Sequence, residues 1–269
     1  MKYILSYFKT EDESMYLAQS ADGFMWDEVN EGKAVLNSTI GSETIRDPFL
    51  LETEKGFIML TTNGWYSEQI VCYQSQDLCT WTDGKLIDFS GNGFVNCWAP
   101  EAKKIGEDYY IYWSSSKEVA NKNDWNHRIY YTKTKDFKHF SKPSIFLDCD
   151  YSCIDGTLFE SDNQLLMCFK DERLDVPTEK SLKLAIFDKE LEIFKPFENS
   201  ISKTWVEGPT VFNIEGCNYI YYDEYTRNKW GMIKSSDIRQ WDEVDSQLFK
   251  LPAGVRHGSI LRLENNYDI

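Results

Sequence analysis

Basic residues are scarce in this chain. It has 29 Lys and Arg against 44 Asp and Glu among its 269 residues, a formal net charge of −15. Nucleic acids and anionic membranes attract basic surfaces, so this charge argues against both as partners. No stretch approaches the roughly 18 apolar residues of a membrane span, and residues 1–8 lead directly into the charged segment 9–13 without the apolar region of a signal peptide. We therefore expect a cytoplasmic protein with neither a nucleic-acid nor a membrane partner.

Recognisable cofactor and metal motifs are also missing. The chain has only three His, and its seven Cys are odd in number; only Cys149 and Cys153 stand close enough to suggest a metal clip. No Cys/His spacing matches a zinc site, and neither a glycine-rich phosphate loop nor a Ser-His-Asp arrangement is visible. Most Cys lie in apolar runs, as buried free thiols do, which favours a reducing compartment. We expect no required cofactor and no metal ligands.

Aromatic residues, in contrast, are abundant. Nine Trp, 16 Tyr and 16 Phe make up 15% of the chain. Aromatic side chains favour β-strands, and they are also the usual platforms for the apolar faces of sugar rings. Composition by itself does not separate these two uses.

A short phrase recurs along the chain at intervals of about fifty residues. It consists of a hydroxyl residue or its neighbour, then Asp, then an aromatic residue. An Asp at the end of a strand can close a tight turn to the next strand. The copies are residues 20–26, 75–81, 134–140 and 235–241, with a degraded copy at 187–194. Five strand–turn–strand copies predict a repeat protein.

A second phrase, with a polar or Pro-containing start and an apolar strand, runs in phase with the first. Its key positions 47, 99, 155, 207 and 257 are 52, 56, 52 and 50 residues apart. A continuous apolar run follows in four units, at 57–60, 109–113, 165–169 and 219–222, as in strands covered on both faces. Four strands per unit and this period match the blade of a β-propeller.

The last unit lacks its outer strands. Only an inner strand at 259–263 follows the fifth phrase, and the missing strands are found at residues 3–8, 15–20 and 26–30. We therefore predict an all-β fold, a five-bladed β-propeller whose ring is closed by the N-terminal strands completing the last blade. In this interpretation residues 1–269 form a single catalytic domain.

The five blade starts are expected to meet at the mouth of the central cavity, because the first strand of each blade lines the axis. The side chains there are Asp47, the Trp98/Glu101 pair, Asp155, Glu207 and His257. A loop carboxylate commonly caps a turn. Three carboxylates crowded around one axis, however, raise each other's pKa, an arrangement that a functional site tolerates and stability alone does not favour. Such carboxylates suit acid–base chemistry, with glycoside hydrolysis as the leading example.

The ordered motifs resemble those of glycoside hydrolase family 43 over essentially the whole chain. They are Arg46-Asp47-Pro48, Trp98-Ala99-Pro100-Glu101, Ile154-Asp155, Glu207-Gly208-Pro209 and Arg256-His257-Gly258-Ser259. The resemblance implies a five-bladed propeller that hydrolyses arabinosides, xylosides or galactosides and inverts the anomeric centre. It also implies that Asp47 is the general base, Asp155 an orienting and pKa-tuning carboxylate, and Glu207 the general acid. His257 matches a histidine near the axis that often borders a bound ion or water cluster.

Two features depart from the family pattern. Gly156 stands where Pro or Ala is more usual, and no additional β-sandwich of the kind found in many xylosidase members is seen. The fructan-cleaving propellers share the Arg-Asp-Pro phrase, but they also carry an Asn-Asp-Pro phrase, which is absent here, and Gly208 rather than Cys follows Glu207. That alternative therefore loses ground.

Further residues are candidates for binding the substrate. We expect this role for Arg46, Trp98, Glu101, Lys170, Arg256 and His257. Residues 170–172 and 223–224 follow central strands and either line the cavity rim or face solvent. Trp65, Trp98 and Trp125 either stack on a sugar or pack in the core, the commoner place for Trp. His127 and His139 are expected at the surface.

The leading hypothesis is an exo-acting, inverting hydrolase of terminal arabinofuranosides, xylosides or galactosides, because a narrow blind cavity accepts a chain end more readily than a mid-chain segment. Its partner is then an oligosaccharide or another glycoside. The alternative is a carbohydrate-binding or scaffolding propeller without catalysis, which the presence of all three carboxylates disfavours. Phosphorolysis would need a basic cluster beside them, for which only Arg46 and Arg256 are available.

Overall fold

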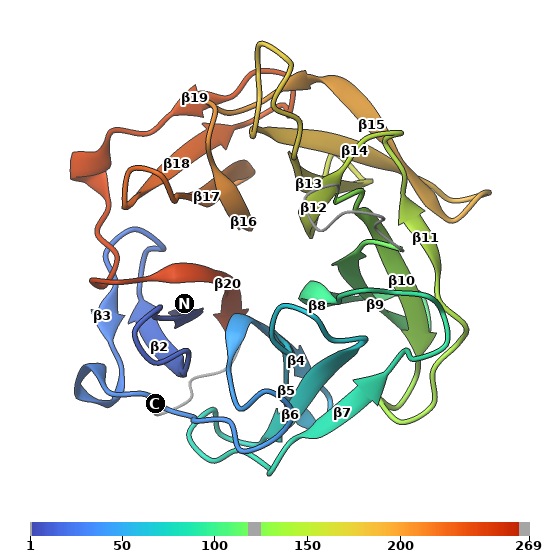
Figure 1. Cartoon of the computed structure of the whole chain (residues 1–269). Coiled ribbons are helices and arrows are strands. Elements are labelled where there is room, and N and C mark those ends of the chain that lie inside the picture. The colour runs from blue at the N-terminus through green and yellow to red at the C-terminus, as the bar shows by residue number, and fades with distance from the viewer. Residues whose placement is uncertain (1, 118–124, 264–269) are drawn as a thin grey trace.

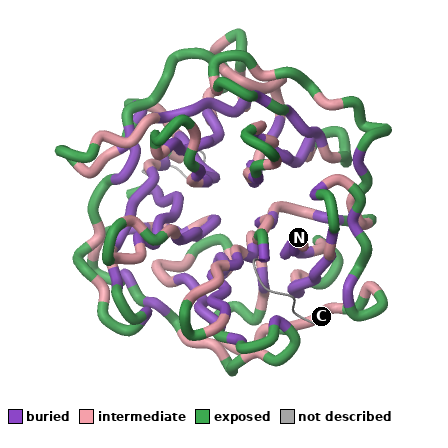
Figure 2. Tube along the Cα trace, turned by 180° about the vertical axis from the view of Figure 1, so that it is seen from behind, coloured by how far each residue is buried: buried purple, intermediate pink, exposed green. Residues whose placement is uncertain are grey.

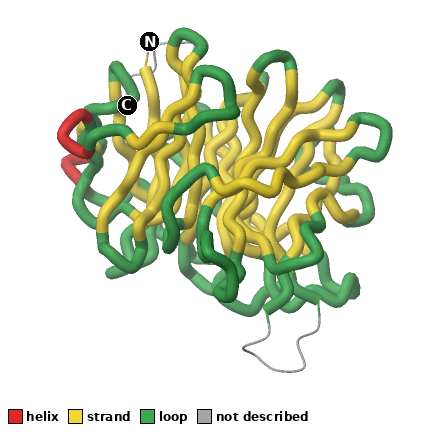
Figure 3. Tube along the Cα trace, turned by 90° about the horizontal axis from the view of Figure 1, so that it is seen from above, coloured by secondary structure: helices red, strands yellow, loops and turns green. Residues whose placement is uncertain are grey.

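The computed structural model describes residues 2–117 and 125–263. These residues form twenty strands and two short 3-10 helices, and they include no α-helix. Figure 1 shows the sheets arranged in a ring around a common axis, a propeller-like fold. Seen from above, the strands run side by side with loops at both ends (Figure 3). The predicted all-β class is confirmed.

The first sheet joins the two ends of the described chain, with strand order β20-β1-β2-β3. Its strands are β1 (Lys2–Phe8), β2 (Met15–Ser20), β3 (Asp27–Glu28) and β20 (Arg256–Leu263), and the 3-10 helices are η1 (Asn30–Gly32) and η2 (Ser246–Leu248). β1 pairs antiparallel with β20, so that Leu5 lies opposite Ile260. The N-terminal strands therefore extend the sheet outward from the C-terminal inner strand, as the repeat pattern predicts.

Two other sheets contain four strands each, in chain order. They are β4 (Arg46–Thr53), β5 (Gly56–Thr62), β6 (Gln69–Ser75) and β7 (Lys85–Asp88), and β16 (Glu207–Ile214), β17 (Cys217–Glu224), β18 (Lys229–Ser235) and β19 (Asp242–Glu243).

The largest sheet has eight strands and consists of two groups of four. The first group is β8 (Trp98–Ile105), β9 (Asp108–Ser115), β10 (Arg128–Thr134) and β11 (Ser144–Leu147); the second is β12 (Cys153–Ser161), β13 (Gln164–Asp171), β14 (Leu182–Asp188) and β15 (Ile193–Ser200). The strand pairing that joins the two groups into one sheet is the parallel pair Leu147–Phe194 of β11 and β15.

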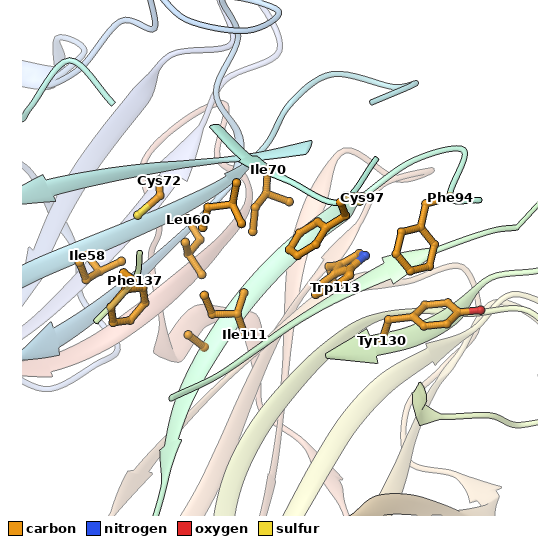
Figure 4. Packing of buried hydrophobic residues seen from close by; sticks show 13 residues of the cluster. Ile58, Leu60, Ile70, Cys72, Phe94, Cys97, Ile111, Trp113, Tyr130 and Phe137 are labelled. Atoms are coloured by element: carbon orange, nitrogen blue, oxygen red, sulfur yellow. The ribbon is translucent and has the colours of Figure 1, made fainter. Parts of the chain in front are cut away.

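The core lies between neighbouring groups of strands. The buried apolar side chains of the described residues gather in five clusters, each between two such groups. In the cluster of Figure 4, Ile58 and Leu60 of β5 face Ile111 and Trp113 of β9. Exposed segments are concentrated in the loops around the outer edge (Figure 2). Both faces of most sheets are thus covered, which explains the continuous apolar runs of the sequence.

Each inner strand carries a β-bulge near its start. The chain advances by three residues from Arg46 to Phe49 while β5 advances by two, and the same irregularity occurs at the equivalent place in β8, β12, β16 and β20. The first bulge residue has a left-handed backbone in four strands: Asp47 (φ 51°), Ala99 (φ 46°), Asp155 (φ 55°) and Gly208 (φ 58°). A bulge re-aims side chains, and here it does so at the same end of every inner strand.

The bulges correct the register predicted for Glu207. The residue equivalent to Asp47 and Asp155 is Gly208, and Glu207 stands one position earlier, opposite Asp223 of β17. A Cβ added at Gly208 would lie 2.7 Å from the His257 ring, so both the space and the positive φ require glycine there. Glu207 therefore reaches the centre from a different backbone position than the two aspartates.

Candidate active site

A cavity of about 300 Å³ opens among the starts of the inner strands. It is at the small end of the range for ligand pockets. Of the residues predicted from the sequence, all but Glu101 line it: Arg46, Asp47, Trp98, Asp155, Lys170, Glu207, Arg256 and His257. Among the other lining residues are Phe8, Thr62, Trp65, Trp125, His127, Glu172 and Asp223. The cavity therefore combines five carboxylates with five cationic or imidazole side chains and an aromatic side.

Asp47 is held by two neighbours. Thr62 Oγ1 donates a hydrogen bond to Asp47 Oδ2 at 2.6 Å, and His257 Nδ1 lies 3.4 Å from Asp47 Oδ1. Arg46, which precedes Asp47 in the chain, does not pair with it but forms an ion pair with Glu13. The basic group that faces Asp47 is therefore His257.

Asp155 connects two inner strands. Its Oδ2 accepts a hydrogen bond from the Gly208 amide at 3.0 Å, so this carboxylate fixes the backbone directly after Glu207. Burial raises the pKa of Asp155 to about 6, and the neighbouring Glu207 acts in the same direction. His257 Nδ1 lies 3.9 Å from Asp155 Oδ2. Burial disfavours the charged ring, but Asp155 and Asp47 raise the pKa of His257 above its ordinary value.

Glu207 belongs to an ion-pair network. Lys170 Nζ donates a hydrogen bond to Glu207 Oε2 at 2.8 Å and lies 2.6 Å from Glu172 Oε1. Lys170 is only 3% exposed, and although burial lowers the pKa of a lysine, Glu207 and Glu172 raise that of Lys170 overall. Arg256 lies 3.8 Å from Glu207 Oε1 through one nitrogen. Lys170 thus holds one oxygen of Glu207, and the other faces Arg256.

The two carboxylate pairs that were ambiguous in the sequence divide by strand alternation. Glu172 and Asp223 line the cavity, and Arg256 Nε lies 2.8 Å from Asp223 Oδ2. Asp171 and Glu224 are buried away from the cavity in ion pairs, Asp171 with Lys183 and Arg173, and Glu224 with Lys203. Asp223 stands directly opposite Glu207, a pairing that a strand register assigned from the sequence could have found.

Asp223 gives the protein a measurable pH dependence. Burial raises the pKa of Asp223 to about 7, whereas an unfolded Asp has a pKa of about 3.9. Between about pH 4 and 7 the folded state therefore holds a proton that the unfolded chain has lost, and this carboxyl's contribution to the free energy of unfolding falls as the pH rises. Between pH 4 and 8 we expect the melting temperature of the wild type to fall relative to that of Asp223→Asn, by about 2–4 °C for each kcal/mol of stability lost.

Circular dichroism melts of both proteins across this pH range check the expectation. The matched control is Asp242→Asn, which removes an exposed carboxylate of β19. If the curves of wild type and Asp223→Asn ran parallel, Asp223 would not hold the extra proton.

Two residues lie where the sequence did not place them. Glu101 is buried outside the cavity lining, where Tyr112 donates a hydrogen bond to Glu101 Oε2 at 2.7 Å and burial raises the pKa of Glu101 to about 7. His127 was expected at the surface, which is wrong: it is 2% exposed and stacks on Trp125, with ring centroids 5.0 Å apart. Burial lowers the pKa of His127 to about 4, so its ring is neutral near pH 7. His139 is exposed, as expected.

No group of three or more His, Cys, Asp or Glu side chains among the described residues is arranged to hold a metal ion. All seven Cys are free, and five of them, including Cys149 and Cys153, are buried. In the same part of the chain no helix has the length and apolar character needed to cross a membrane.

Several carboxylates that share one cavity suit the acid–base chemistry of glycoside hydrolysis. The chain belongs to the glycosyl hydrolase 43-related family, described as a probable glycosyl hydrolase domain, whose sequence model matches residues 1–268. An α-L-arabinofuranosidase of Bifidobacterium longum subsp. longum is 27% identical over 172 residues, which cover 51% of this chain and 16% of that protein. The match thus spans only a small part of that relative.

Solved structures show the same fold. The α-L-arabinofuranosidase from Lactobacillus brevis superposes with a TM-score of 0.60 at 17% identity, over 75% of this chain and 72% of that chain. The endo-arabinase from Bacteroides thetaiotaomicron gives a TM-score of 0.61 at 18% identity, over 78% and 83%. At these identities the similarity concerns the fold.

Proposed function

We propose that this protein is an exo-acting glycoside hydrolase that removes a terminal arabinofuranosyl, xylosyl or galactosyl unit with inversion. The observation that carries the proposal is the meeting of Asp47, Asp155 and Glu207, from three inner strands, in one small cavity. Membership of a glycosyl hydrolase family supports it, and the arabinofuranosidase among the relatives supports an arabinose-containing substrate. A cavity of about 300 Å³ favours one sugar unit at a chain end.

The geometry suits a division of roles. An inverting hydrolase needs a carboxylate that activates water and a carboxylic acid that protonates the leaving oxygen. Asp47 is the base: Thr62 binds its Oδ2, which leaves Oδ1, beside His257, for the water. Glu207 is the acid: Lys170 binds its Oε2, which leaves Oε1 for the proton. Asp155 positions Glu207 through the Gly208 amide.

We also propose that the ring is a five-bladed propeller and works as a single domain. The eight-stranded sheet then counts as two blades, joined at Leu147–Phe194, and β1 to β3 complete the blade that begins with β20. Support comes from the five bulged inner strands and the five clusters between them. The proposed chemistry uses carboxylates alone and requires no cofactor.

The test is a panel of nitrophenyl α-L-arabinofuranoside, β-D-xyloside and β-D-galactoside, followed by NMR of the first product formed. We expect hydrolysis of at least one member, with the anomeric configuration inverted. Retention of configuration would reject the assigned mechanism. Binding of these sugars without any hydrolysis would favour the carbohydrate-binding alternative.

A further inference from the structure

Four aromatic side chains form a continuous surface on one side of the cavity mouth. We call this surface the aromatic wall; it consists of Trp65, Tyr66, Trp98 and Trp125. The Trp65 and Trp98 rings meet edge to face with centroids 5.5 Å apart, Trp98 and Trp125 are 5.0 Å apart, and Tyr66 stacks on Trp125 at 5.9 Å. Its three Trp side chains line the cavity, and Tyr66 extends the wall beyond it.

Two side chains of the aromatic wall leave much of their apolar surface in contact with water. Trp65 is 57% exposed and Tyr66 60% exposed. Among the described residues, the only other exposed Phe, Tyr or Trp side chain is Phe197, at 40%. Each Å² of apolar surface left in water forgoes roughly 25 cal/mol. Two adjacent exposed aromatic residues beside a cavity therefore indicate a binding surface.

The loop that carries these rings is held in place before any ligand arrives. Asn63 Oδ1 accepts a hydrogen bond from the Ser42 amide at 2.8 Å, and Asn63 Nδ2 donates one to Ser67 Oγ at 2.9 Å, so the loop is tied on both sides of the rings. Trp98 Nε1 donates a hydrogen bond to the Trp65 carbonyl at 3.0 Å. Rings fixed in this way lose little conformational entropy on binding.

The inner side of Trp65 is also supported. The Arg46 guanidinium lies 4.9 Å from the centroid of the Trp65 ring and 4.9 Å from that of Phe8, and it is neutralised by Glu13. The ring is therefore braced by a cation–π contact, which explains why Arg46 turns away from Asp47.

We propose that the aromatic wall binds a second sugar residue of an oligosaccharide, adjoining the residue held in the cavity. This inference rests on the proposed function, in which the cavity holds the terminal sugar and the rest of the substrate passes over the cavity mouth. A pyranose or furanose ring has an apolar C–H face that matches an indole or phenol ring, and its hydroxyl edges remain in water. The wall thus makes the protein selective for oligosaccharides over simple glycosides.

The experiment measures binding, so that it does not depend on turnover. Xylo- and arabino-oligosaccharides of one to four units are titrated by calorimetry into Asp47→Asn protein, with and without Trp65→Ala. We expect affinity to rise about tenfold from the monosaccharide to the disaccharide, equal to about 1.4 kcal/mol. Trp65→Ala should remove this rise by weakening the disaccharide about tenfold more than the monosaccharide, and Trp65→Tyr should restore most of it.

Phe197→Ala, which removes the exposed aromatic ring on β15, is the matched control and should change nothing. The proposal is overturned if Trp65→Ala leaves the rise intact, or if it weakens monosaccharide and disaccharide equally. If the rise in affinity depended on Trp65 but the wild-type protein hydrolysed no glycoside, the sugar-binding role of the aromatic wall would be supported and the proposed hydrolase function would be rejected. A rise seen only for aryl glycosides would overturn the assignment to a sugar.

Discussion

Replacing Asp47 by Ala is expected to lower kcat by about 10²–10⁴-fold on every glycoside that the protein cleaves, because general-base catalysis contributes on this scale. Replacing Glu207 by Ala should instead give a loss that depends on the leaving group. Alkyl glycosides and natural disaccharides need a proton on the leaving oxygen and should be slowed by a similar factor. Dinitrophenyl glycosides need little protonation and should be almost unaffected. Steady-state kinetics with both kinds of substrate measure the difference.

Two further measurements test the roles assigned to Asp47 and Glu207. Azide should restore turnover to Asp47→Ala on activated substrates, since a small anion can take the place of the activated water. Asp27→Ala, an exposed carboxylate of β3, is the control and should behave like the wild type. If the leaving-group dependence appeared in Asp47→Ala rather than in Glu207→Ala, the two roles would have to be exchanged.

Replacing Lys170 by Met is expected to lower kcat on glycosides with poor leaving groups by about 10²-fold, the scale on which a misplaced catalytic group loses rate. The ammonium group lies 2.8 Å from Glu207 Oε2 and fixes the orientation of the carboxyl group. Without this contact the carboxyl group can turn away from the leaving oxygen. Dinitrophenyl glycosides, which need little protonation, should be slowed much less, and steady-state kinetics with both kinds of substrate measure the difference.

The control for this variant is Lys170→Arg, which keeps a cationic hydrogen-bond donor beside Glu207 and should retain most of the rate. Glu172 retains Lys180 as an ion-pair partner when Lys170 is removed, so the cavity is not left with an isolated buried carboxylate there. Equal losses on both kinds of substrate, or no loss at all, would show that Lys170 does not position Glu207.

The sequence pattern was sufficient to place the strands and eight of the residues that line the cavity. Equivalent positions of a ring of repeats come to the same distance from its axis, so a phrase recurring every fifty residues predicts that Asp47, Asp155 and His257 meet. The one-residue error at Glu207 has a local cause. The bulge position is marked by the Pro or Gly that follows it, at 48, 100, 156, 209 and 258, and aligning these residues would have placed Gly208, not Glu207, beside the aspartates.

Contacts between different parts of the ring were not predictable in the same way. Arg46 pairs with Glu13, which lies 33 residues earlier in the chain and in another sheet region. His127 directly precedes β10, a strand expected at the outside of its blade, yet its ring packs against both Trp98 and Trp125. Such partners depend on side-chain direction and on packing across sheets, for which a single sequence carries no periodic signal.

The shared bulge creates equivalent backbone positions near the centre of the ring, and these positions carry different side chains. The same left-handed backbone that presents Asp47 and Asp155 occurs at Ala99, where only a methyl group is attached. Asp and Asn adopt this conformation more readily than Ala does, so the backbone itself favours a longer polar side chain at this position. Position 99 in β8 could therefore carry a longer polar side chain. Such a substitution would add a chemical group to the site while the buried clusters between the sheets stay unchanged.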